Sequence, residues 1–210
     1  MQQYVFVDNI SKVLIAIFKD EDFEMNKKEI HTEILYRRIY EYERFQPVVH
    51  SFVNKLKKFK KDKYIFILRK ICLIDGNPLP LIQREIYKLL YEGEEGDFIY
   101  GIGYDEDDTI VIIKHTEDNE LEEVDGRMFN TSFATEEANY ILDQLSLEAD
   151  ICFGRNKYSV PFFKQRYPIS KLIKNITDEG MSKILRAPLV RILTSLYIDD
   201  FPHSLMKMSR

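Results

Sequence analysis

The residues best suited to binding chemistry are a run of lysines before the middle of the chain. The run contains Lys55, Lys57, Lys58, Lys60, Lys61 and Lys63. Ammonium groups at this density attract a phosphate-rich ligand or an anionic membrane surface. The same residues also suit a solvated helix end, because cations complement the dipole at a helix C-terminus. Both interpretations stay open, and the six lysines are candidate contacts for an anionic partner.

A second candidate is the acidic stretch Asp105-Glu-Asp-Asp108, whose clustered carboxylates could bind calcium. An EF-hand loop needs glycine at its sixth position and glutamate at its twelfth. Counted from Asp105, these positions hold Ile110 and Thr116. The stretch is therefore predicted to be a solvated acidic loop, with weak cation binding as the alternative.

No residue pattern points to catalysis or to a bound cofactor. The histidines are scattered, at His31, His50, His115 and His203. Gly101-Ile-Gly103 is too short for a phosphate-binding loop, and neither Cys72 nor Cys152 has the surroundings of a nucleophile. We expect no enzymatic activity, no cofactor and no metal site. The cysteines read as small buried hydrophobic residues, with a disulfide between them as the alternative.

Size and charge restrict the class of protein further. The chain has 210 residues and a formal net charge of −5, which argues against a dedicated nucleic-acid-binding protein. It begins without the basic start and apolar core of a signal peptide. No apolar run approaches the roughly 18 to 20 residues of a membrane helix, so we expect no direct membrane insertion. These features predict a cytoplasmic protein, or the cytosolic part of a larger one.

Apolar residues at helical spacing predict helices along most of the chain. The predicted helices cover 10–18, 26–40, a segment opening at Pro47, 64–74, a segment opening at Pro80, 135–152, 169–176 and a last one through Leu189 and Tyr197. Gly154 is predicted to stop the helix over 135–152, just after Cys152. Pro188 is predicted in or near the first turn of the last helix, where it costs little.

The composition changes between residues 92 and 134, where acidic residues and glycines dominate. The β-branched segment Asp108–Lys114 within this stretch predicts a small strand or hairpin. We interpret 92–134 as an acidic, variable insertion that is partly β or disordered. The fold class is therefore predicted as mainly α, an armadillo-like α-solenoid of short helices with this insertion. No internal repeat of fixed period supports the solenoid on its own.

Three sequence blocks resemble one known family. They are Tyr64–Gln83, in which an apolar helix runs into a cysteine and a polar turn; Gln144–Asn156, which is similar to a Gln-Leu-x-Leu-x-Ala-x-x-Cys-x-x-Arg pattern; and Leu185–His203, which begins Leu-Arg-Ala and closes with aspartate and proline. In this order the blocks resemble the RIH domain, the homology domain shared by ryanodine receptors and inositol trisphosphate receptors. The resemblance covers the chain from about residue 30 to its end and implies one helical domain over 1–210.

The resemblance also carries expectations for single residues. Arg155, Arg186, Arg191 and Asp199 fall in the second and third blocks and are candidate structural or interface residues. Arg186 and Arg191 are expected to reach acidic groups on neighbouring helices. Glu148 departs from the family, which tends to carry a large apolar residue there, so its carboxylate needs a partner or solvent. The basic residues with which the family contacts its ligand belong to other segments and have no counterpart here.

Two functions are compatible with these observations. The resemblance implies a cytosolic scaffold or regulatory domain of an inositol trisphosphate receptor-like calcium-release channel. In that setting it would transmit conformational change on the cytosolic face of the endoplasmic reticulum or a related calcium store. Its partners would be other domains of the same larger chain, in a homotetramer if it is part of a channel. The alternative is a soluble protein–protein interaction adaptor that uses the same helical stack without channel activity.

Overall fold

The computed structural model describes residues 42–74, 77–92, 98–115 and 120–199. The chain divides into two compact units, 1–48 and 49–210, and only the end of the first belongs to the described part. The helices predicted over 10–18 and 26–40 lie outside these residues, as does the end of the third block from Asp200 onward. The fold below is that of the second unit.

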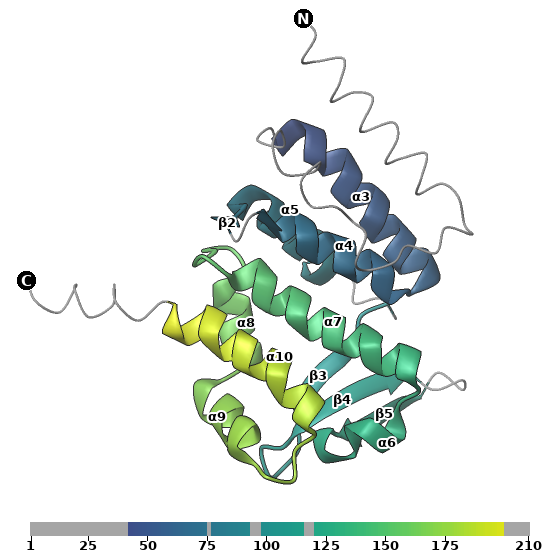
Figure 1. Cartoon of the computed structure of the whole chain (residues 1–210), viewed down its shortest axis with the longest axis vertical. Helices are drawn as coiled ribbons and strands as arrows, with labels where there is room; N and C mark the ends of the chain where they lie inside the picture. The colour runs from purple at the N-terminus through teal and green to yellow at the C-terminus, as the bar shows by residue number, and fades with distance from the viewer. Residues whose placement is uncertain (1–41, 75–76, 93–97, 116–119, 200–210) are drawn as a thin grey trace, which may run out of the picture. The chain divides into compact units, whose positions relative to one another are not determined.

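Helices make up most of the second unit, with a small antiparallel sheet between them (Figure 1). The elements are α3 (Tyr42–Phe59, which begins in the first unit), α4 (Asp62–Cys72), β1 (Leu73–Ile74), β2 (Asn77–Pro78), α5 (Pro80–Tyr91), β3 (Gly101–Tyr104), β4 (Ile110–His115), β5 (Leu121–Asp125), the 3₁₀ turn η1 (Gly126–Met128), α6 (Phe129–Ser132), α7 (Thr135–Cys152), α8 (Val160–Arg166), α9 (Ile169–Thr177), α10 (Lys183–Leu193) and the π-helical turn η2 (Thr194–Ile198).

Helix α7 forms the centre of this unit, with α4 and α5 on one side and α10 on the other (Figure 1). Its second half is buried without interruption from Gln144 to Cys152. A helix that is buried on all faces must be surrounded by other elements, and it is apolar wherever it has no polar partner. Leu145, Leu147 and Ile151 are fully buried here, and each contributes about 1.5–3 kcal/mol by leaving water. The block Gln144–Asn156 is therefore the core of the fold.

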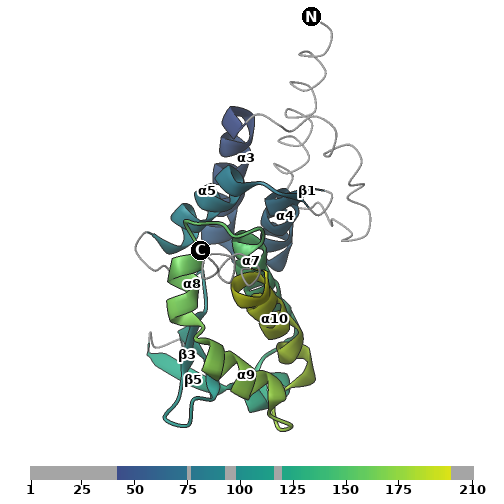
Figure 2. The ribbon, with the colours of Figure 1, turned by 90° about the vertical axis from the view of Figure 1, so that its left-hand side faces the viewer.

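The sheet has the order β3-β4-β5, and both pairs are antiparallel. Figure 2 shows β3 and β5 beyond the end of α8 and next to α9. The main chain at Tyr100, just before β3, is held by the Gln144 side chain, which accepts from its N–H and donates to its C=O at 2.9 Å each. The Asn175 side chain on α9 accepts from the N–H of Ile110 at 2.7 Å, at the start of β4. Side chains of two helices thus satisfy backbone groups at the sheet.

The sequence correctly predicts a mainly helical fold and β structure within 92–134. The β structure is more extensive than a hairpin, and β4 joins the core, because Ile110 and Ile112 are fully buried. Two prolines differ from prediction. Pro47 lies inside α3, which begins at Tyr42, and Pro188 is the sixth residue of α10 rather than part of its first turn. The carbonyl oxygen of Ile184 therefore accepts no hydrogen bond from residue 188, because proline has no backbone N–H.

Within the described ranges, none of the helices combines the length and apolar character needed to cross a membrane.

Candidate functional site

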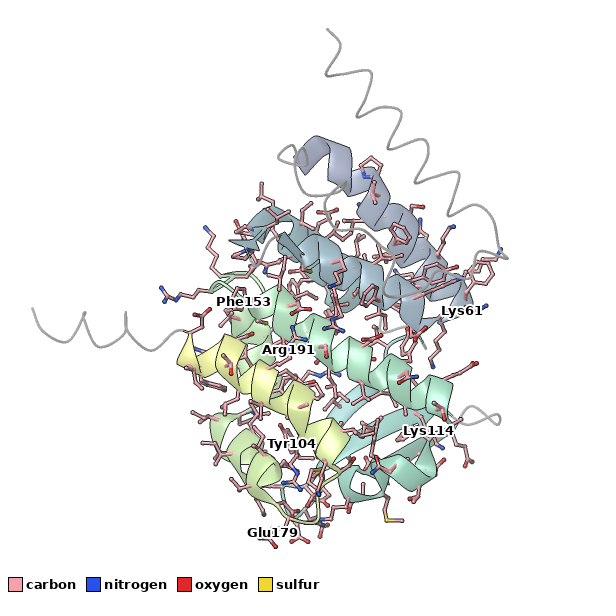
Figure 3. The ribbon with its side chains drawn as sticks, viewed as in Figure 1. Lys61, Tyr104, Lys114, Phe153, Glu179 and Arg191 are labelled. Carbon is pink, nitrogen blue, oxygen red and sulfur yellow. The ribbon has the colours of Figure 1, made fainter. Side chains whose placement is uncertain are left out.

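The three blocks that carry the family resemblance meet at one cluster of charges. Arg69 on α4 donates from Nε to Asp150 Oδ2 at 3.0 Å and from Nη1 to Asp143 Oδ1 at 2.7 Å. Arg191 on α10 donates from Nη2 to the other oxygen of Asp150 (Figure 3). We name Arg69, Asp143, Asp150 and Arg191 the inter-block ion cluster. Through it, one α7 carboxylate links α4 to α10.

The burial of Asp150 determines what this cluster contributes to the fold. The side chain is nearly inaccessible to solvent. Burial raises the pKa of the Asp150 carboxyl above its ordinary value, and the guanidinium groups of Arg191 and Arg69 counteract this only in part. The ion pairs therefore offset part of the cost of burying the carboxylate. A buried ion pair of this kind adds little net stability, but removing one of its partners is strongly destabilising.

Glu148, the residue that departs from the family pattern, also has partners. Its carboxylate is 1% exposed and accepts from Tyr91 Oη at 3.0 Å, from Gln144 Nε2 at 3.2 Å and from Tyr167 Oη. Burial and the adjacent Glu148 charge raise the pKa of both tyrosine hydroxyls well above the ordinary value, so both remain donors. This Glu148 cluster joins α5, α7 and the C-terminal end of α8. Because three donors bind the carboxylate, it can be buried where the family tends to have an apolar side chain.

Amide side chains close the C-terminal end of α7. Gln83 on α5 donates to the carbonyl oxygens of Asp150 at 2.8 Å and Phe153 at 3.0 Å, which satisfies acceptors that a helix end leaves open. Asn156 donates to Gln83 Oε1 and to the carbonyl of Pro80, both at 3.1 Å. The first and second blocks are thereby locked together a second time, at the end of α7 marked by Phe153 in Figure 3.

Gly154 is required by the turn that follows α7. Its φ is +73°, a left-handed conformation that side chains disfavour. A Cβ at this position would lie 2.3 Å from Cγ of Pro78. The glycine predicted to stop the helix therefore also allows the turn to pack against β2.

Arg155 and Asp199 contact each other, although not as an ion pair. Arg155 donates from Nε to the backbone carbonyl of Asp199 at 2.6 Å. The Asp199 carboxylate accepts from the N–H of Gly154 at 3.3 Å. The two residues connect the turn after α7 to the end of η2, which is a structural role.

Among the residues that the structure describes, Arg186 binds backbone carbonyl oxygens and no carboxylate of another helix. It donates to the carbonyl oxygens of Met181 at 3.1 Å and Glu179 at 3.3 Å, in the turn before α10. Of the two arginines expected to reach acidic groups, Arg191 does so and Arg186 organises the chain beside its own helix.

The lysine run lies at the end of α3, in the link to α4 and in the first turn of α4. Several of its ammonium groups rest on aromatic rings: Lys57 Nζ lies 5.1 Å from the Phe98 ring centre and Lys60 Nζ lies 4.3 Å from that of Tyr100. Lys57, Lys58, Lys60 and Lys61 are exposed.

The acidic stretch predicted as a solvated loop forms the turn between β3 and β4. Asp105 Oδ1 accepts from the N–H groups of Asp107 at 2.9 Å and Thr109 at 2.7 Å. Asp108 pairs with Lys171 Nζ at 2.6 Å, and this partner lowers the pKa of its carboxyl. Across the part of the chain that the structure describes, no three His, Cys, Asp or Glu residues group as metal ligands would.

Cys72 and Cys152 are buried and free, on the neighbouring helices α4 and α7. Burial raises the pKa of both thiols above the ordinary value, so both stay protonated. They act as small core residues, and the disulfide alternative is not realised.

The sequence analysis missed Arg69, Asp143 and Asp150, which together with Arg191 form the inter-block ion cluster. Arg69 and Asp150 both stand in apolar stretches of recognised blocks. A charged residue on an otherwise apolar helical face could have indicated these contacts, because a buried charge needs a partner of opposite sign. Which helix supplies that partner is decided only by the fold.

Comparison with known proteins gives one informative match. The chain is 25% identical over 158 residues to inositol 1,4,5-trisphosphate receptor-like protein A of Dictyostelium discoideum. The alignment covers 73% of this chain and 5% of that protein, so the chain corresponds to a small part of its relative's length. No protein-family profile matches the chain. The chain is therefore distantly similar to a region of an inositol trisphosphate receptor-like protein.

Proposed function

We propose that this chain is an RIH-like scaffold and regulatory segment of an inositol trisphosphate receptor-like calcium-release channel. The similarity to the receptor-like protein of Dictyostelium carries the proposal. The segment works by holding neighbouring parts of a large receptor in fixed relative positions and by passing rigid-body displacements between them. As part of such a channel it acts on the cytosolic side of a calcium store, within a tetramer.

The packing of the three blocks supports this role. A segment that transmits displacement needs helices that move together, and α4, α7 and α10 are joined through the inter-block ion cluster. Gln83 and Asn156 make a second connection, between α5 and the end of α7. The same helices would form the armadillo-like stack that the resemblance implies.

A chimaeric receptor tests the proposal. The region of the Dictyostelium receptor-like protein that aligns with this chain is replaced by the chain, and inositol trisphosphate-evoked calcium release is measured in vesicles from cells. We expect release to be restored relative to a receptor lacking the region. Asp150→Asn in the chimaera is expected to reduce release, and Lys183→Gln, an exposed control on α10, is expected to leave it unchanged. A chimaera that assembles and reaches the membrane but never releases calcium would refute the proposal.

A second candidate function is an adaptor that binds other proteins through the helical surface. Exposed apolar side chains on α9 and α10 favour it: Ile169, Ile173, Ile184 and Val190 are each 44–47% exposed. Exposed apolar residues on neighbouring helices are typical of protein contact surfaces. The chimaera separates the two functions, because an adaptor does not restore calcium release.

A further inference from the structure

A basic and aromatic surface lies away from the lysine run, where α5 meets the turn between α7 and α8. Leu81, Arg84 and Lys88 follow one another at helical spacing along α5. Lys157 and Tyr158 come from the turn. We name these five residues the α5 face. None of its residues belongs to the inter-block ion cluster or to the candidate sites predicted from the sequence.

The turn is held against α5 by buried hydrogen bonds. Asn156, which is nearly inaccessible, donates to the carbonyl oxygen of Pro80 at 3.1 Å and accepts from the N–H of Tyr158 at 3.0 Å. These contacts fix Tyr158 beside α5 before any partner arrives. A surface that is already ordered loses less conformational entropy on binding.

The arginine on this face is oriented by the tyrosine. The guanidinium carbon of Arg84 lies 4.3 Å from the ring centre of Tyr158, and Lys157 Nζ lies 5.1 Å from the same ring. Stacking uses the flat face of a guanidinium and leaves its N–H edge for a carboxylate, which such an edge can bind through two hydrogen bonds. Arg84 Nε is buried and has no hydrogen-bond partner.

The cations of the α5 face are not neutralised within the described residues. Arg84, Lys88 and Lys157 form no ion pair there. Glu85, the nearest acidic residue on α5, pairs with His50 at 2.8 Å instead. The chain as a whole has a net charge of −5. Three unpaired cations grouped on one face therefore attract a small negatively charged partner to that face rather than to the rest of the surface.

We propose that the α5 face is a docking site for an acidic peptide segment of a partner protein. Carboxylates of that segment pair with Arg84, Lys88 and Lys157. An aliphatic side chain of the segment covers Leu81, which is 49% exposed, and the open part of the Tyr158 ring. The net negative charge of the chain disfavours the extended anionic surfaces of nucleic acids and membranes, so a peptide is the better fit. The proposal does not depend on channel function.

Fluorescence anisotropy of the full chain tests the docking site. The probe is a short labelled peptide rich in glutamate and leucine, and the reference peptide has every glutamate replaced by glutamine. We expect saturable binding of the acidic peptide only. Arg84→Gln with Lys157→Gln should weaken binding at least about tenfold, equal to about 1.4 kcal/mol. The matched control, Lys174→Gln with Lys183→Gln, removes the same charge from exposed positions on α9 and α10 and should change affinity less than about twofold.

Three outcomes would overturn the docking site. The first is no binding of the acidic peptide beyond that of the glutamine peptide. The second is equal loss of affinity in both double variants, which would mean attraction by overall charge. The third is tighter binding of phosphatidylserine vesicles that depends on Arg84 and Lys157, which would make the face a lipid contact. Circular dichroism of each variant verifies that the fold is retained.

Discussion

Arg69 on α4 donates to Asp150 on α7 across 3.0 Å, between residues that are 81 positions apart in the chain. The same carboxylate also accepts from Arg191 on α10. The three blocks that resemble the RIH domain are thus linked through one aspartate.

Asp150→Asn is expected to lower the free energy of unfolding by about 2–3 kcal/mol, because it leaves two arginines facing a neutral group. This is less than full removal of a buried partner costs, since Arg191 is half exposed and regains solvent. The quadruple replacement Arg69→Met, Asp143→Asn, Asp150→Leu and Arg191→Met should lose less than the single variant, because it removes all four charges of the inter-block ion cluster together. Urea denaturation measures both. A quadruple variant that is less stable than Asp150→Asn would show that the ion pairs contribute net stability.

Glu148→Leu is expected to destabilise the fold by about 1–3 kcal/mol for each tyrosine hydroxyl that loses its acceptor. Glu148→Gln should cost less, because it keeps an acceptor oxygen for Tyr91 or Tyr167. Adding Tyr91→Phe and Tyr167→Phe to Glu148→Leu should recover most of the loss, which thermal denaturation would detect. If the added phenylalanines recover nothing, the hydroxyl–carboxylate contacts are not the reason that Glu148 is tolerated.

Gly154→Ala is expected to lower the free energy of unfolding by at least about 2 kcal/mol, because it adds a left-handed strain and a collision with Pro78. Gly103→Ala is the matched control. Its Cβ would lie 3.4 Å from Val111 Cγ2, an ordinary contact, so it should cost less than about 1 kcal/mol. Equal losses in chemical denaturation of the two variants would contradict the packing of the turn against β2.

Stability is expected to fall at alkaline pH. The pKa values of Tyr91, Tyr140 and Tyr167 are raised above the ordinary 10.0, chiefly by burial. The folded protein therefore keeps these protons while the unfolded chain loses them. Each tyrosine therefore makes its full contribution to the free energy of unfolding below pH 10. Above pH 10 this contribution declines by up to about 1.4 kcal/mol per pH unit. Urea midpoints measured from about pH 8 to pH 11 should show this decline.

The double variant Tyr91→Phe and Tyr167→Phe is the control for the alkaline decline. It removes two of the hydroxyls, so its slope above pH 10 should be shallower than that of the unchanged chain. Identical slopes would assign the decline to other groups.

Titration with inositol trisphosphate is expected to give no saturable heat, because the basic residues with which the family binds its ligand have no recognised counterpart in this chain. Tight binding would contradict that expectation. Loss of such binding on neutralising Lys55–Lys63 would locate the ligand at the lysine run.

The positions of the helices were predictable from the sequence where apolar residues recur at helical spacing. The stop at Gly154 followed from the sequence for the same local reason, since α7 ends at Cys152. The three-stranded sheet was predictable only at Asp108–Lys114, because β3 is short and half glycine and β5 is short and acidic, and both pair with β4. Pro188 was misplaced because α10 extends further toward its N-terminus than its apolar residues indicate.

The contacts that matter for function depend on which helices are neighbours, and one sequence does not contain that information. Nothing local connects Arg69 to Asp150, or Arg84 to Tyr158. The lysine run was prominent because its charges are adjacent in the chain. The α5 face has cations from two separate elements, so only the fold reveals it.

Native-state hydrogen exchange of α4, α7 and α10 tests most directly whether the three blocks act as one rigid body. We expect the most protected amides of the three helices to open with the same free energy and to lose protection together in Asp150→Asn. If α4 opens independently of α7 and α10, or if Asp150→Asn affects α7 alone, the three blocks are not mechanically joined and the proposed scaffold role fails.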